Sequence, residues 1–247
     1  MNQPLSNKVA LVTGGSRGIG AAICQKLASH GAHVVVNYAS SPDAAKKLVE
    51  QIVTDGGQAI AIKADMSDPA QVISLFNEAE KSLGKVSILV NNAGTAVPGS
   101  LAEITDEDFD KQINLNVRGV FVASREAARR MESGGRIINI GSSLGEAVPM
   151  PGLSIYCATK FTIAGLTRGW ARDLGPQKIT VNCVEPGPID TESNPADGPQ
   201  ANYQKAVTAL GRYGKPEEVA SLVAYVASPE ASNITGATLR VDGGWGA

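Results

Sequence analysis

The sequence has few of the features that mark membrane-spanning, secreted or disulfide-linked proteins. No apolar run approaches the ~20 residues that a helix needs to cross a bilayer, and residues 1–8 lack the charged and apolar segments of a signal peptide. Cys24, Cys157 and Cys183 are odd in number and scattered, which indicates neither a disulfide framework nor a metal site. We therefore expect a cytoplasmic location and no metal, and we expect the glycosylation sequon at 233–235 to stay unmodified.

An excess of charge of one sign is also missing. The 22 Lys and Arg side chains are balanced by 24 Asp and Glu, giving a net charge of −2, and no basic stretch occurs. Nucleic acids and anionic membranes select basic surfaces, so we expect neither as a partner. Aromatic residues make up 4% of the chain, against 27 glycines, which favours aliphatic packing and tight backbone turns.

Short β-branched runs alternate with helical stretches along the 247 residues. The predicted strands are 9–13, 34–38, 59–63, 88–90, 137–140, 180–184 and 239–241. The predicted helices are 19–29, 42–54, 68–83, 105–131, 155–173 and 217–227. Continuous apolar strands between helices indicate a parallel sheet covered on both faces. We therefore expect an α/β fold with one doubly wound, Rossmann-like, seven-stranded parallel sheet in a single domain over 1–247.

Two predicted helices have clear N-terminal signals, and one long stretch shows no regular pattern. Asp68 stands before Pro69, and Thr105 stands three residues before Asp108, both of which are patterns of helix N-termini. Residues 185–202 are rich in Pro, Gly, Asp and Asn and follow the sixth strand, at the carboxyl edge where ligands bind in such sheets. We expect a substrate lid at about 187–202.

A glycine turn joins the first strand to the first helix. Gly14, Gly18 and Gly20 in the segment 13–20 have the spacing G-x-x-x-G-x-G. Small residues let the backbone approach a pyrophosphate, which the positive end of the helix stabilises. The position between a strand and a helix is the context that a dinucleotide site requires.

The end of the second strand bears on which dinucleotide binds. An acid there would bond the ribose 2′-hydroxyl and repel a 2′-phosphate, but the place is taken by neutral Asn37, followed by Tyr38, Ala39 and Ser40. Arg17, inside the glycine turn, has a forked donor group suited to a phosphate. These residues favour NADP(H) over NAD(H). Asp65, after the third strand, either accepts a hydrogen bond from adenine or terminates its strand.

Tyr156 and Lys160 are four residues apart on a predicted helix, so they share a face. A free phenol titrates near pH ~10, and a neighbouring ammonium favours its ionised form. Such a tyrosine gives a proton to a carbonyl oxygen or takes one from an alcohol. The spacing alone also fits an ordinary amphipathic helix.

Taken in order, these motifs resemble those of the short-chain dehydrogenase/reductase family over essentially the whole chain. The family's glycine motif matches 14–20, its Asn-Asn-Ala-Gly motif matches 91–94, and its Tyr-x-x-x-Lys motif matches 156–160. Its catalytic asparagine, its Pro-Gly turn and its Asp-Gly-Gly ending match Asn116, 186–187 and 242–244.

The resemblance implies a nicotinamide cofactor and a role for each matched residue. Tyr156 would be the general acid/base, and Lys160 would hold the nicotinamide ribose. Asn116 would hold a water that links Lys160 to solvent, and a serine after the fifth strand would bind the reacting oxygen. The residues that we expect to contact the cofactor are Gly14, Ser16, Arg17, Gly18, Ile19, Gly20, Asn37, Tyr38, Ala39, Ser40, Asp65, Met66, Asn92, Ala93, Gly94, Tyr156, Lys160, Pro186, Gly187, Ile189 and Thr191.

Two neighbouring serines compete for the catalytic place. Counting from the strand selects Ser142, whereas counting back from Tyr156 by the commonest family spacing selects Ser143. We prefer Ser142, because strand geometry fixes the direction of a side chain better than loop length does.

The function that these residues predict is NADPH-dependent reduction of a small ketone or aldehyde to an alcohol, by a homotetramer or homodimer as the resemblance implies. The nearest alternative is a 3-oxoacyl thioester reductase, for which Arg129, Arg130 and Arg172 would meet an acidic carrier protein or else be solvated. A regulatory protein that binds a nucleotide without turnover is the alternative of another class. Trp245 either packs in the core or lies at a subunit interface.

Overall fold

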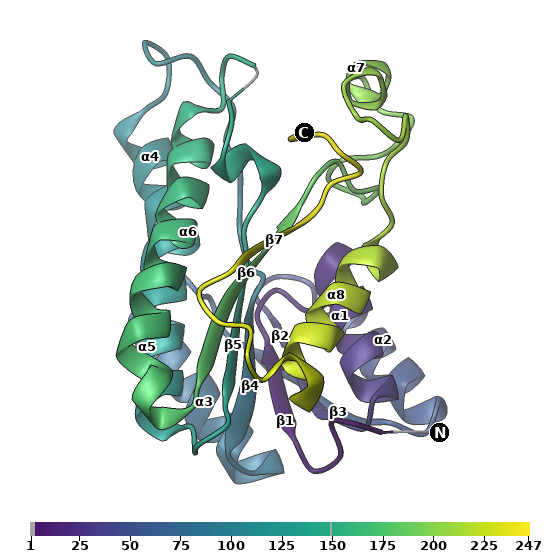
Figure 1. The fold of residues 1–247 in the computed structure, drawn as a ribbon, viewed down its shortest axis with the longest axis vertical. Helices are drawn as coiled ribbons and strands as arrows, with labels where there is room; N and C mark the ends of the chain where they lie inside the picture. Colours follow the sequence, from purple (N-terminus) through teal and green to yellow (C-terminus); the bar gives the residue numbers. More distant parts are fainter. Residues whose placement is uncertain (1–2, 149) are drawn as a thin grey trace.

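Seven parallel strands form one sheet in the order β3-β2-β1-β4-β5-β6-β7 (Figure 1). The computed structural model describes residues 3–148 and 150–247. The strands are β1 (Val9–Val12), β2 (His33–Tyr38), β3 (Gln58–Lys63), β4 (Val86–Asn91), β5 (Arg136–Ile140), β6 (Thr180–Pro186) and β7 (Thr238–Val241). The strand order reverses between β1 and β4, which creates the crevice where dinucleotides bind in doubly wound sheets. The predicted fold class is confirmed.

Helices cover both faces of the sheet (Figure 1). One face carries α1 (Gly18–Ser29), α2 (Pro42–Thr54) and α8 (Pro216–Ala227). The other carries α3 (Pro69–Leu83), α5 (Val120–Arg130) and α6 (Ser154–Leu174). Two shorter helices, α4 (Asp106–Ile113) and α7 (Ala201–Ala206), lie towards the carboxyl ends of the strands. Short 3-10 turns, η2, η3 and η4, occupy Ser143–Gly145, Gly175–Gln177 and Pro229–Ala231.

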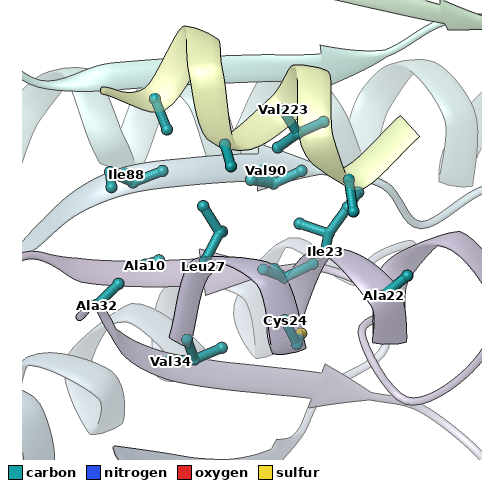
Figure 2. Packing of buried hydrophobic residues seen from close by; sticks show 14 of the residues in the cluster. Ala10, Ala22, Ile23, Cys24, Leu27, Ala32, Val34, Ile88, Val90 and Val223 are labelled. Atoms are coloured by element: carbon teal, nitrogen blue, oxygen red, sulfur yellow. The ribbon is translucent and has the colours of Figure 1, made fainter. Parts of the chain in front are cut away.

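The core consists of two layers because successive strand residues point to opposite faces of the sheet. Ala10 and Val12 of β1 pack on the α1 and α8 side, whereas Val9 and Leu11 pack on the α3 and α5 side. Figure 2 shows the first layer, in which side chains from α1 and α8 meet those of β1 and β4. Aliphatic packing on both faces fixes the sheet, so the loops at its carboxyl edge start from rigid positions.

The predicted helix over 105–131 is one continuous helical path with an altered middle. Thr105 accepts a hydrogen bond from Asp108 N at 3.1 Å and caps α4, as predicted. Residues Asn114–Gly119 (η1) are π-helical, and α5 then continues to Arg130. A methyl group on Gly119 would lie 2.3 Å from Met66 O, so a glycine lets this segment press against the loop after β3. π-helical turns are frequent at functional sites, and Asn116 lies in this one.

The irregular stretch after the sixth strand is shorter than expected at both ends. β6 continues to Pro186, and α7, which the sequence did not predict, begins at Ala201. Helix α3 begins as predicted, since Asp68 accepts a hydrogen bond from Ala70 N at 2.8 Å. Within the described ranges, no helix combines the length and apolarity that crossing a membrane requires.

Candidate active site

The glycine turn needs its glycines for two separate reasons. Gly14 and Gly18 have φ of +60° and +54°, a region that side chains disfavour. A methyl group on Gly20 would lie 2.3 Å from Gly14 O and 2.6 Å from Asn92 Nδ2. The backbone of the turn at Gly14 therefore lies so close to Gly20 of α1 that no residue with a side chain fits at position 20.

Asn37 supports the glycine turn from inside, which corrects the expectation that its side chain faces the cofactor. The residue is 1% exposed. Its Oδ1 accepts from Gly14 N at 3.1 Å, and its Nδ2 donates to Ala64 O at 3.0 Å. The amide is occupied by backbone, so the residues of this strand end that lie open to a ligand are Tyr38, half-buried, and the exposed Ala39 and Ser40.

The two asparagines of the 91–94 segment also bond to protein. Asn91 is buried and donates to Asn139 Oδ1 of β5 at 2.8 Å. Asn92 donates from Nδ2 to Thr13 O and Gly14 O, each at 3.0 Å. The backbone amides of Asn92 and Ala93 both donate to the Thr13 hydroxyl. Asn92 and Ala93 thus lock β4 to the glycine turn, and an amide that donates twice to backbone contributes to the site mainly by holding its shape.

The other predicted cofactor residues lie around this turn. Arg17 is exposed, and one of its guanidinium nitrogens lies 4.0 Å from a carboxylate oxygen of Glu192. Ser16 and Ile19 are half-buried beside it. Asp65 is exposed and accepts from Ser67 N at 2.8 Å, so it also organises its own loop. Met66 is buried.

Tyr156 and Lys160 lie on the first turns of α6, as predicted. The Lys160 ammonium is 5.5 Å from the centre of the Tyr156 ring. Lys160 is 7% exposed, and its Nζ donates to Ile140 O at 2.9 Å. An ammonium has three donors. This bond anchors the group, and two donors remain for ligands as far as the described residues are concerned. Tyr156 is half-buried.

Asn116 meets the same place from the π-helical segment. Its Nδ2 donates to Thr95 O at 2.8 Å and to the Thr159 hydroxyl at 3.2 Å, and its Oδ1 accepts from Thr95 N at 2.9 Å. A methyl group on Gly94 would lie 3.4 Å from Asn116 Oδ1 and 3.9 Å from Lys160 Nζ. Gly94 therefore marks the point where Asn116, Lys160 and the segment after β4 meet.

The two candidate serines have different environments. Ser143 is 3% exposed, and its hydroxyl lies 3.2 Å from Pro186 O and 3.4 Å from Asp242 Oδ2. Ser142 is half-buried, and its Oγ accepts from Leu144 N at 3.1 Å. The Ser143 hydroxyl is thus directed to protein acceptors, whereas the bond of Ser142 uses its oxygen as acceptor and leaves its proton for a ligand. This difference supports Ser142 as the ligand-facing residue.

The segment after β6 returns to the glycine turn. A methyl group on Gly187 would lie 2.7 Å from Asp242 Cα, and Pro186 pairs with Val241 of β7. Ile189 is buried and forms a bridge to Gly214. Thr191 forms a turn with Asn194, and its methyl group lies 3.5 Å from where a Gly18 side chain would begin. The predicted lid thus starts in contact with the predicted cofactor turn.

Sequence reasoning missed three groups at this site. The hydroxyls of Thr13 and Thr159 position neighbouring groups, and the one sequence signal for each was a polar residue beside a motif. Glu185 is fully buried directly before Pro186, and its signal is an acid next to the Pro-Gly turn.

Of the arginines considered for a carrier protein, Arg129 and Arg130 pair with the buried Glu126. These pairs hold the pKa of Glu126 below its ordinary value despite its burial, which acts in the opposite direction.

The residues fit a dinucleotide on grounds of shape and charge. Among the residues that the structure describes, no side chain caps the N-terminus of α1, and the first turn of this helix holds no acid. Its backbone amides and positive dipole are therefore available to an anion in the crevice. Gly14, Gly18 and Gly94 keep the backbone bare along that crevice. Trp245 is half-buried.

Comparisons with known proteins agree over nearly the whole chain. A family model described as enoyl-(acyl carrier protein) reductase matches residues 14–246. The cyclic-di-GMP-binding biofilm dispersal mediator protein of Escherichia coli (strain K12) is 44% identical, covering 98% of both chains. Elsinochrome reductase 1 of Elsinoe fawcettii is 42% identical, covering 97% of this chain and 94% of that protein.

A solved structure is similar at the same level. It is a short-chain dehydrogenase from Burkholderia cenocepacia J2315 in complex with NADP, 49% identical, with a TM-score of 0.97 over 99% of this chain and 100% of that one.

Proposed function

Since the chain belongs to the short-chain dehydrogenase/reductase family of oxidoreductases, we propose that it reduces a small ketone or aldehyde to an alcohol, reversibly and with NADP(H). The observation that carries the proposal is the convergence of Tyr156, Lys160 and Asn116 beside the glycine turn. A protein that only bound a nucleotide would not need a phenol, an ammonium and an amide at one point.

Each residue has a defined task in the proposed reaction. The bound nicotinamide would supply or accept the hydride, and the protein supplies orientation and proton movement. Tyr156 Oη gives a proton to the carbonyl oxygen during reduction. The Lys160 ammonium offsets the negative charge left on Tyr156 and binds ribose through its free donors. The Ser142 hydroxyl orients the reacting oxygen, and Asn116 helps to pass protons between Lys160 and solvent.

The preference for NADP(H) rests on charge around the glycine turn. Arg17 is exposed there, and Tyr38, Ala39 and Ser40 at the end of β2 carry no acid that would repel a 2′-phosphate. The complex of the Burkholderia cenocepacia relative with NADP supports binding of NADP(H).

A panel of ketones and aldehydes followed by NADPH absorbance tests the activity. We expect turnover on at least one carbonyl, lost in Tyr156→Phe. Tight NADPH binding without oxidation of NADPH by any carbonyl in a broad panel would contradict the proposal.

The cofactor preference is tested by Arg17→Ala. We expect kcat/KM with NADPH to fall by about 10-fold or more, because a charge-assisted hydrogen bond is lost, and kcat/KM with NADH to stay nearly constant. Lys26→Ala, at the far end of α1, is the matched control. A higher kcat/KM with NADH than with NADPH in the unchanged protein would overturn the preference.

Two alternatives have specific support. The description of the matching family model names acyl carrier protein, which favours an acyl thioester substrate, although the pairing of Arg129 and Arg130 within the chain weakens their role as a carrier contact. The name of the Escherichia coli relative favours a nucleotide-binding regulatory protein. Turnover of acyl thioesters against free ketones separates the first from the main proposal, and absence of turnover favours the second.

A cytoplasmic homotetramer or homodimer completes the proposal. Light scattering coupled to size-exclusion chromatography measures the assembly, and a monomeric mass would contradict it.

A further inference from the structure

Glu185 is a buried acid that the proposed reaction does not use. It is 0% exposed at the carboxyl end of β6, and neither carboxylate oxygen has a hydrogen-bond partner among the described residues. A buried carboxyl without partners is costly. Its placement beside the segment of the candidate serines therefore calls for an explanation.

The side chain lies under the segment that carries both candidate serines. A methyl group on Gly141 would lie 2.9 Å from Glu185 Cγ, and one on Gly145 would lie 3.3 Å from Glu185 Oε1. Two glycines thus allow the end of β5 and the following 3-10 turn to rest directly on the carboxyl group. No larger residue fits at either position without movement.

The same segment holds Lys160. Ile140 O accepts the hydrogen bond from Lys160 Nζ at 2.9 Å, and the next residue, Gly141, is the one that packs on Glu185. A methyl group on Gly145 would also lie 3.2 Å from the backbone carbonyl of Lys160. Glu185 therefore packs against Gly141, the residue next to the carbonyl that anchors the ammonium. It also packs against the turn at Gly145, which contacts the backbone of Lys160.

We propose that Glu185 is a positioning residue for the proposed proton transfer: its side chain supports the 140–145 segment that anchors Lys160, and its charge sets how strongly the ammonium serves Tyr156. This inference rests on the proposed function. Glu185 acts through Lys160 and contacts neither substrate nor cofactor.

The charged groups around Glu185 come from three elements. Burial raises the pKa of Glu185 to about 7, against the opposing effect of Arg168 and Lys160 of α6. The carboxylate of Asp242, after β7, adds to the rise. On its own strand, burial raises the pKa of the Cys183 thiol to about 12, so this thiol stays neutral. Arg240, which pairs with Glu185 in strand register, forms an ion pair with Glu146.

A pKa of about 7 places the change of charge of this carboxyl group near neutral pH. When Tyr156 gives up its proton, Lys160 offsets the charge that appears on the phenol oxygen. An anion at Glu185 draws on the same ammonium and weakens this effect. Ionisation of Glu185 is thus expected to slow carbonyl reduction as pH rises through about 7.

Melting temperatures test the titration without any turnover. Folding raises the pKa of this acid, so the folded state holds the proton longer than the unfolded chain does, and the wild type loses stability as pH rises towards 7. The melting temperature of Glu185→Gln minus that of the wild type should therefore increase between pH 5 and 8. Glu132→Gln, which changes an exposed acid bonded to Lys85, is the control and should show no such increase.

Kinetics test the positioning. We expect the ratio of kcat for Glu185→Gln to kcat for the wild type to rise by about three-fold or more between pH 6 and 8, with KM for NADPH changed by less than about two-fold. Glu185→Ala should be slower at every pH because the support is lost, and Glu185→Gln should restore the rate at acid pH.

The failures are distinguishable. Absence of turnover in the wild type and in every variant would mean that the proposed function is wrong. In that case, a melting difference that does not change with pH would still overturn the role of Glu185. Active variants with a constant kcat ratio across pH would overturn this inference alone.

Discussion

The glycine turn and the lid segment (residues 187–202) meet at the same edge of the sheet but are held in different ways. The turn is fixed by two side-chain amides: the buried Asn37 of β2 bonds Gly14 N, and the half-buried Asn92, directly after β4, bonds Thr13 O and Gly14 O. The first residues of the lid bond to the rest of the fold, with Gly187 N donating to Val241 O and Asp190 N to Gly214 O. Residues 191–202 are held mainly by turns of the lid itself, such as Ala196 N donating to Asp190 Oδ1. Its links to the turn are a methyl contact and one exposed ion pair.

This difference separates chemistry from specificity. These partly buried hydrogen bonds leave the groups around the turn one arrangement, since a donor or acceptor that loses its partner inside the protein costs about 1–3 kcal/mol. Residues 191–202 of the lid make few contacts with the turn, so different lids are compatible with the same turn. The motif residues of the chain therefore predict the reaction of the family but not its substrate.

Tyr156→Phe should give the largest effect, because it removes the proton donor and leaves the fixed region intact. We expect kcat to fall by about 10³-fold or more, with NADPH affinity, measured by fluorescence, nearly unchanged. Tyr225→Phe on the exposed face of α8 is the control and should keep full activity. A Tyr156→Phe enzyme that retains a tenth of the rate would remove the tyrosine from the mechanism.

Ser142→Ala and Ser143→Ala sharpen the contrast within one loop. Ser142→Ala should lower kcat by about 10²-fold, as expected when a donor to the reacting oxygen is lost. Ser143→Ala should mainly lower the free energy of unfolding, by about 0.5–1.5 kcal/mol, because its buried hydroxyl bonds protein atoms. A larger loss of turnover at position 143, with thermal melting run in parallel, would reverse the assignment.

The sequence was enough to predict whatever depends on local pattern. Apolar runs located the strands, Asp68 and Thr105 located two helix starts, and the motifs identified the residues that meet at Gly94. Asn37 was misread because every residue of 34–37 is buried, so alternation could not tell which face its side chain takes.

Features set by distant contacts could not be predicted. The π-helical turn at Asn114–Gly119 depends on how closely Gly119 approaches Met66 O, and these residues are far apart in sequence. The burial of Glu185 depends on two glycines of another strand end. Helix α7 follows a stretch of turn-forming residues that gave no periodic pattern.

Gly20→Ala tests how rigid the glycine turn is. The new methyl group would meet Gly14 O and Asn92 Nδ2, and overpacking of this kind costs about 1–3 kcal/mol. We expect a melting temperature roughly 3–10 °C lower and weaker NADPH binding. Gly175→Ala, in a helical conformation with nothing within 4 Å of the added methyl, should be neutral or stabilising. Equal melting for the two variants would mean that the turn yields as readily as a surface position.

Glu192→Gln should give the smallest effect and probes the one ion pair between the two regions. The pair with Arg17 is 4.0 Å long and both side chains are mostly exposed, so its loss should barely change stability. Freeing the guanidinium should tighten NADPH binding by less than about five-fold, with the gain fading as salt rises. NADH binding should not change, because no 2′-phosphate is present to use the freed charge. A large change in melting temperature, or an equal change in the affinities for NADPH and NADH, would show that the lid stabilises the glycine turn.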